Sequence, residues 1–331
     1  LKIGATGQVE WARSYGGTGD EQAWSVDATG DGGYVFSGGT TSFGAGQADF
    51  WVVKVDSSGN VQWENAYGGT GEDAPGAPYD EYVCRVAVDK EGKFIVSSIS
   101  DSYEPNGDVL NIRLEPADGS VLWAYGYGHT SEDSTWSFAV LEDGGYLFTG
   151  ALTDPVALDA DAWALKTDTS GNIVWQKTYG LAGWFDEVLG QAATSDGGAL
   201  LAAYYEASNQ DWRSHLVRIA ADGSLMWARE YRNGEMSWPN ATVELADGFG
   251  VIGVSAADAA MWDSQLWFMK TASDGSLGAS CQLGVPITLE VKDAPATRKD
   301  VTVTVTPTSA TVTDTAVTTQ QIAPAPTYQC Q

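Results

Sequence analysis

The stretch Asp56-Ser-Ser-Gly-Asn-Val-Gln-Trp63-Glu-Asn-Ala-Tyr67-Gly-Gly69 returns, with variations, throughout the first 276 residues. Its Trp-x-x-x-Tyr unit occurs five times, and successive tryptophans are 52, 60, 52 and 52 residues apart. A period of about 50 residues indicates a repeat architecture. On a strand, side chains four residues apart point to the same side, so each unit offers a paired packing anchor. The pairs are Trp11 and Tyr15, Trp63 and Tyr67, Trp123 and Tyr127, Trp175 and Tyr179, and Trp227 and Tyr231.

Two families of turns divide each repeat into four short extended segments. Asp31-Gly-Gly, Asp143-Gly-Gly and Asp196-Gly-Gly separate alternating apolar runs, as expected of hairpins that need positive φ. A second turn, such as Ser57-Ser-Gly-Asn60, precedes each tryptophan. Four strands per repeat, without helical periodicity, predict an all-β fold of four-stranded propeller blades. The repeats begin near residues 9, 61, 121, 173 and 225, the propeller spans 1–276, and an extension spans 277–331.

The number of blades depends on how the ends of the repeat region meet. The first tryptophan strand, Val9–Tyr15, has no inner strands before it, and Asn240–Thr271 has no outer strand after it. We therefore predict five blades, with Val9–Tyr15 completing the last one and closing the ring. Six blades, with one built from Leu1–Tyr15 and a hairpin of the extension, are the main alternative. A truncated larger ring is the third.

The repeat unit resembles known propellers. Its Asp-x-x-Gly-Asn/Ser-x-x-Trp segment is similar to the tryptophan-docking motif of quinoprotein-type (PQQ) propellers. The full unit, including Trp51-Val-Val-Lys-Val-Asp56, resembles secreted repeat propellers of prokaryotic surface proteins. This resemblance implies an extracellular or cell-surface location. It implies no quinone cofactor, because an adjacent cysteine pair and the acidic metal and base cluster of that family are missing.

The strongly negative net charge of the chain limits the classes of molecule that it can bind. The chain has 44 acidic and 17 basic residues, for a formal net charge of −27, and this field repels nucleic acid and anionic membranes. No apolar run is long enough for a membrane span. Cations are the expected small partners, and acidic pairs recur after each Tyr-Gly, where they can bind Ca²⁺ or simply remain solvated. These acids are Asp20, Glu21, Glu72, Asp73, Glu132, Asp133, Asp186 and Glu187.

Departures from the repeat are the other candidate sites. Trp184 and Phe185 fall in the loop of the fourth repeat and form a candidate ligand patch for surface glycans, with packing beneath the loop as the alternative. The second repeat carries an insertion within Ala74–Glu81. The two histidines, His129 and His215, stand at non-equivalent positions, and no nucleophile, metalloprotease or phosphate-loop motif occurs. We predict no catalytic residues.

The extension differs in character from the repeats. Val301-Thr-Val-Thr-Val-Thr306 alternates β-branched and polar residues, which favours strands but supplies too little apolar surface to fold alone. We expect its strands to pair with another subunit, and the alternative is that they fold back on their own propeller. Cys281 and Cys330 bracket the extension and are the expected disulfide, although two other pairings with Cys84 stay open. Asn240-Ala-Thr242 is an N-glycosylation sequon.

These features together predict a non-enzymatic extracellular structural propeller. It would be a homo-oligomer or polymer, in a filament or surface layer, assembled through its extension. A carbohydrate-binding or hydrolytic propeller that acts at the channel or the loop rim is the alternative.

Overall fold

The structure is a computed structural model and describes residues 1–73, 84–103, 108–128, 133–153, 160–181, 183–206, 211–231, 236–256, 264–278, 284–294 and 297–315. These residues form antiparallel strands and turns and contain no helix. The fold is therefore all-β, as the turn pattern predicts, and no helix in the described part of the chain could cross a membrane.

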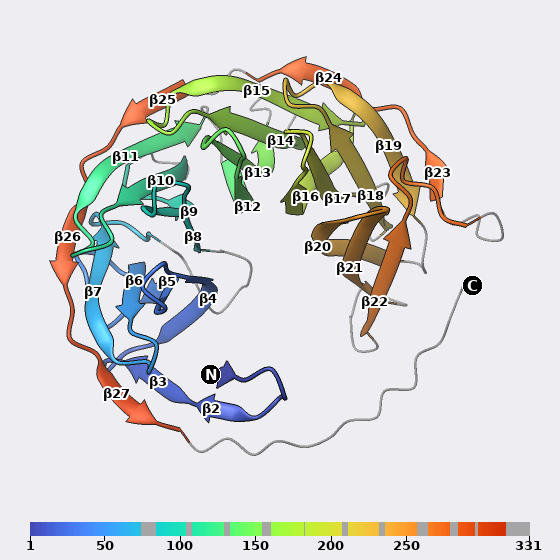
Figure 1. Cartoon of the computed structure of the whole chain (residues 1–331). Coiled ribbons are helices and arrows are strands. Elements are labelled where there is room, and N and C mark those ends of the chain that lie inside the picture. Colours follow the sequence, from blue (N-terminus) through green and yellow to red (C-terminus); the bar gives the residue numbers. More distant parts are fainter. Residues whose placement is uncertain are drawn as a thin grey trace.

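Five repeats form five consecutive blades arranged around a common centre (Figure 1). Blades 1 to 4 each have four antiparallel strands from the repeat, the first innermost, and blade 5 has three. Blade 1 contains β4 (Glu21–Ala28), β5 (Tyr34–Thr40), β6 (Asp49–Val55) and β7 (Val61–Gly68); blade 2 contains β8 (Arg85–Val88), β9 (Phe94–Ser100), β10 (Asp108–Leu114) and β11 (Val121–Gly128). Blade 3 contains β12 (Asp133–Val140), β13 (Tyr146–Thr153), β14 (Ala160–Thr167) and β15 (Ile173–Gly180); blade 4 contains β16 (Phe185–Ala193), β17 (Ala199–Glu206), β18 (Trp212–Ile219) and β19 (Leu225–Tyr231); blade 5 contains β20 (Met236–Leu245), β21 (Gly248–Ala256) and β22 (Ser264–Thr271).

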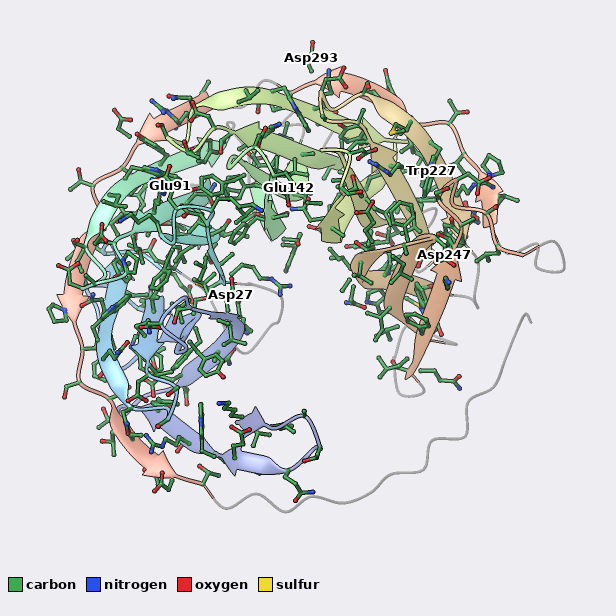
Figure 2. The ribbon with its side chains drawn as sticks, in the orientation of Figure 1. Asp27, Glu91, Glu142, Trp227, Asp247 and Asp293 are labelled. Atoms are coloured by element: carbon green, nitrogen blue, oxygen red, sulfur yellow. The ribbon has the colours of Figure 1, made fainter. Side chains whose placement is uncertain are left out.

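The apolar core lies between neighbouring blades. Each cluster of buried side chains joins two successive sheets; the cluster between blades 1 and 2, for example, contains Phe50 and Val52 from β6 and Val86 and Val96 from blade 2. Figure 2 shows side chains filling the spaces between the sheets, with Asp293 at the outer circumference and Asp27 on the inner side of the ring. A sheet buried on both faces explains why strands such as Asp49–Val55 are apolar almost throughout.

The extension folds back on its own propeller. Its strands run backwards around the circumference, and each adds one strand to the outer edge of a preceding sheet (Figure 1). The expectation that they pair with another subunit is therefore wrong for residues 284–315. The reason is that each outer repeat strand offers an unpaired edge that a short extended segment can cover. The added strands are β23 (Gly284–Pro286) on β19, β24 (Glu290–Asp293) on β15, β25 (Thr297–Asp300) on β11, β26 (Thr304–Pro307) on β7 and β27 (Thr311–Asp314) on β3.

The ring stays open, which differs from the predicted closure. The N-terminal residues form β1 (Lys2–Ile3), β2 (Val9–Trp11) and β3 (Arg13–Gly16), called here the N-terminal half-blade, and in the described chain none of them pairs with β22. Lys2 lies opposite Trp11, just as Lys54 lies opposite Trp63 in blade 1. β1 thus occupies the edge of β2 that closure requires for β22. The six-blade alternative predicted that a hairpin of the extension would join the N-terminal strands. In the structure only one strand of the extension, β27, pairs with the half-blade.

Candidate functional site

The repeated Trp and Tyr side chains dock each outer strand onto the next blade. Trp63 donates its indole N–H to the Pro116 carbonyl at 2.8 Å, and the Tyr67 hydroxyl donates to the Gly119 carbonyl at 2.6 Å. The other pairs make the same two bonds to the corresponding turns: Trp11 to Ser57 and Tyr15 to Gly59, Trp123 to Thr169 and Tyr127 to Gly171, Trp175 to Ala221 and Tyr179 to Gly223, Trp227 to Ser273 and Tyr231 to Gly275. This regularity assigns the aromatic repeat to blade docking.

One acid of each rim pair accepts hydrogen bonds from nearby backbone. The buried Asp73 carboxylate accepts from the Gly69 N–H at 2.5 Å and from the hydroxyls of Ser100 and Ser102. The acids that correspond to it accept from loop backbone as well: Glu21 from Gly17 at 2.9 Å, Asp133 from Thr153 at 3.2 Å and Asp186 from Leu181 at 2.9 Å. Within the described residues, no group of three or more His, Cys, Asp or Glu side chains could hold a metal ion. Calcium binding stays a prediction, and Glu132 lies outside those residues.

The basic residue of each third strand pairs with the acid of the preceding hairpin turn. Lys54 lies 2.9 Å from Asp31, and Arg218 lies 2.6 Å from Asp196. The pKa of Asp196 is lowered to about 2, first by the hydrogen bond from the Thr194 hydroxyl and then by the bond from Arg218, while burial acts in the opposite direction. The same pairing recurs at Arg113 with Glu91, Lys166 with Asp143, and Lys270 with Asp247, and Arg113 also pairs with Asp89. The position is structural in every blade.

Blade 4 differs from the other repeats in a group of polar side chains on its inner and outer strands. His215 and Arg213 stand on β18 where blade 1 has Trp51 and Asp49 on β6, and Tyr205 and Glu230 occupy neighbouring strands. The buried Tyr205 hydroxyl donates to the Glu230 carboxylate, and Arg213 lies 3.9 Å from the same carboxylate. These departures from the repeat therefore meet in one polar cluster, called here the blade-4 cluster.

His215 is the buried centre of the blade-4 cluster. Its Nε2 lies 3.9 Å from Oδ1 of Asp186, and both side chains are fully buried. Burial lowers the pKa of His215 to about 3, so the imidazole is neutral at physiological pH. Sequence reasoning set His215 aside as an isolated histidine. Superposing the repeats would have shown it replacing an aromatic core residue in the same blade that carries Trp184 and Phe185.

Trp184 and Phe185 lie over this cluster with 38% and 39% of their surfaces exposed. Their ring centroids are 6.5 Å from Tyr205 and 6.4 Å from Tyr204, respectively. Tyr204 contacts Trp212, which contacts Trp238 of blade 5. The candidate patch is thus half-exposed, and its inner faces are packed. An aromatic row flanked by carboxylates and a guanidinium can bind the faces and hydroxyls of a sugar.

The five innermost strands line a cavity of about 240 Å³ at the centre of the ring. Arg85 stands there at the register position held by Ser25 and Ser137 in neighbouring blades. Its Nε donates to the Trp136 carbonyl at 3.1 Å, and burial lowers its pKa. Asn240, the glycosylation candidate, is exposed on the same lining. The cavity offers one guanidinium with amide and hydroxyl groups, a set that suits an anionic or hydroxyl-rich group.

The cysteines are only partly described. Cys84 is a buried free thiol whose pKa burial raises to about 12, which makes it unreactive near neutral pH. Cys281 and Cys330, the expected disulfide, lie outside the described residues, as do His129 and the insertion in the second repeat. The disulfide therefore stays a prediction.

Comparison with known proteins finds similarity in solved structures alone. No family model matches the sequence, and no curated protein sequence matches it. A protein of unknown function from Dyadobacter fermentans aligns with a TM-score of 0.47 and 12% identity over 74% of each chain. An endo-arabinase from Bacteroides thetaiotaomicron aligns with a TM-score of 0.38 and 8% identity, over 78% of this chain and 97% of the arabinase chain. An endo-1,4-beta-xylanase from the same organism aligns with a TM-score of 0.38 and 11% identity, over 84% of this chain and 97% of the xylanase chain. These values carry no inference about activity.

Proposed function

We propose that the protein is a non-enzymatic structural propeller of the cell surface or extracellular space that self-assembles into filaments or layers. The observation that carries this proposal is the uncovered end of blade 5. Leu266 and Phe268 on β22 are 78% and 71% exposed, although the corresponding side chains of blades 1 to 4 are buried. A large apolar face beside an open strand edge is a site of association.

Light scattering and negative-stain imaging of the full chain test this role. We expect the wild type to form particles many subunits long as its concentration rises. Leu266→Glu combined with Phe268→Glu should raise the concentration needed for assembly on the order of 100-fold, because two apolar side chains lose their burial. Met226→Glu is the matched control, since Met226 is also exposed but lies on β19. A wild type that stays monomeric at high concentration would refute the proposal.

A second candidate function, carbohydrate binding, is favoured by the aromatic row at Trp184 and Phe185. Loss of one stacking ring removes part of the contact with a sugar face, so Trp184→Ala and Phe185→Ala should each reduce glycan binding about tenfold or more. A glycan array with the wild type and both variants measures this. Trp24→Ala, at a partly buried tryptophan of blade 1, is the control. Binding that survives both rim substitutions would place any glycan site elsewhere.

A further inference from the structure

The end of blade 5 presents one apolar face and one open edge. Phe268 lies opposite Ile252, and Leu266 lies opposite Val254, so these four side chains share a face of the sheet. Ile252 is exposed as well. In the described chain, β22 pairs with β21 alone, which leaves its outer N–H and C=O groups without a strand partner.

The repeat shows what this face contacts elsewhere. Phe268 and Leu266 precede Lys270 by two and four residues, as Val52 and Phe50 precede Lys54 in blade 1. Val52 and Phe50 are fully buried against Val86 on the innermost strand of the next blade. The exposed end of blade 5 is therefore the first half of an interblade interface.

The second half of that interface is exposed at the other end of the chain. Val26 on β4 holds the register position of Val86, since Val26 lies opposite Phe36 and Val86 opposite Val96. Val86 is buried, whereas Val26 is 65% exposed. In the half-blade, Trp11 and Tyr15 already dock on blade 1, as the outer-strand Trp and Tyr of the other repeats dock on the blade that follows.

We propose that blade 5 of one copy joins the N-terminal half-blade of a second copy, so that one propeller blade is shared between two subunits. β22 of the first copy pairs with β2 and β3 of the second, and β1 is displaced from the edge of β2. The register follows from blade 1, where Phe50 lies opposite Tyr67 and Lys54 opposite Trp63. Leu266 therefore lies opposite Tyr15, Phe268 opposite Arg13, and Lys270 opposite Trp11.

A second copy fits these two ends better than the same chain does. Figure 1 shows blade 5 and the half-blade well apart, on opposite sides of the opening in the ring. The extension fixes this arc from outside, because β23 to β27 pair with four blades and the half-blade in turn. The contact joins different patches on successive subunits, so it generates rings or open filaments and no closed twofold dimer. This inference rests on the proposed self-assembly and names its interface.

Cysteine pairing between single variants tests the shared blade. Arg13→Cys and Phe268→Cys are made in separate chains, mixed without reductant, and compared on gels with each variant alone. We expect a crosslinked dimer from the mixture that exceeds either single variant at least tenfold, and a ladder of multiples from the double variant. Ser195→Cys with Phe268→Cys is the control, because Ser195 lies in an exposed turn of blade 4.

Each outcome is decisive and separates the two proposals. A double variant that crosslinks only within one chain would show a closed ring and overturn both the shared blade and self-assembly through this end. Polymers seen by light scattering without crosslinks in the mixture would overturn the shared blade and leave self-assembly standing. Crosslinks in the mixture together with polymers support both.

Discussion

Deletion of residues 284–331 is expected to cause the largest loss of stability in this protein. The extension adds an outer strand to four blades and to the half-blade, and it buries Leu289 in the core between blades 3 and 4. It also places the Arg298 guanidinium 4.2 Å from the centre of the Tyr125 ring and pairs Lys177 with Asp293 at 2.9 Å. The strands are short and partly exposed, so their net contribution is far below the sum of their hydrogen bonds.

The expected decrease is about 5 kcal/mol in the free energy of unfolding, which corresponds to a melting temperature lower by roughly 7 °C for a chain of this size. Circular dichroism or calorimetry measures the shift. The control is deletion of residues 316–331, which removes Cys330 but keeps β23 to β27. If both deletions melt alike, the effect belongs to the disulfide or to the terminal residues, and the strands contribute little.

Gly171→Ala is expected to be among the most damaging single substitutions in the repeated turns. Gly171 has φ of 75°, in the region that side chains other than glycine rarely adopt. A Cβ at this position would lie 2.6 Å from a Tyr125 ring atom and 2.9 Å from the Tyr127 hydroxyl, which donates to the Gly171 carbonyl. The substitution therefore adds a steric clash to backbone strain, and it disturbs the docking of blade 2 on blade 3.

We expect Gly171→Ala to lower the free energy of unfolding by about 3–5 kcal/mol, of which backbone strain accounts for only about 1–2 kcal/mol. Gly32→Ala is the matched control, because Gly32 has φ of 81° but no atom within 4 Å of the added Cβ. Gly32→Ala should lower the free energy of unfolding only by the contribution of backbone strain. Urea unfolding of both variants, compared at constant m-value, gives the difference. Equal losses would mean that the Trp-Tyr docking tolerates movement of the turn.

Much of the propeller is predictable because its information is local and repeated. Asp31-Gly-Gly fixes a hairpin whatever the rest of the chain does, since its φ requirement arises within a few residues. The five Trp-x-x-x-Tyr units give strand type, side-chain direction and period together. The docking role of these aromatics also follows from repetition, because a ligand site has no need to occur in every blade.

The candidate sites were less accessible to sequence reasoning. Trp184 and Phe185 stood out as an aromatic pair in a loop, but the blade-4 cluster beneath them joins residues from three strands. Arg213 and Glu230, for example, are 17 residues apart and meet only because β18 and β19 are paired. Arg85 likewise acquires a role at the centre of the ring only when five innermost strands converge.

The sequence by itself determined the all-β fold, the four-stranded blade, the turns and the residues that dock one blade on the next. The tertiary structure alone decided where the extension pairs and whether the ring closes. The reason is that any unpaired strand edge can accept any extended segment of suitable alternation. The extension could satisfy its backbone on another subunit or on β19, β15, β11, β7 and β3, and β2 could accept β1 or β22. Such choices depend on which edges geometry brings together, and no local pattern records that.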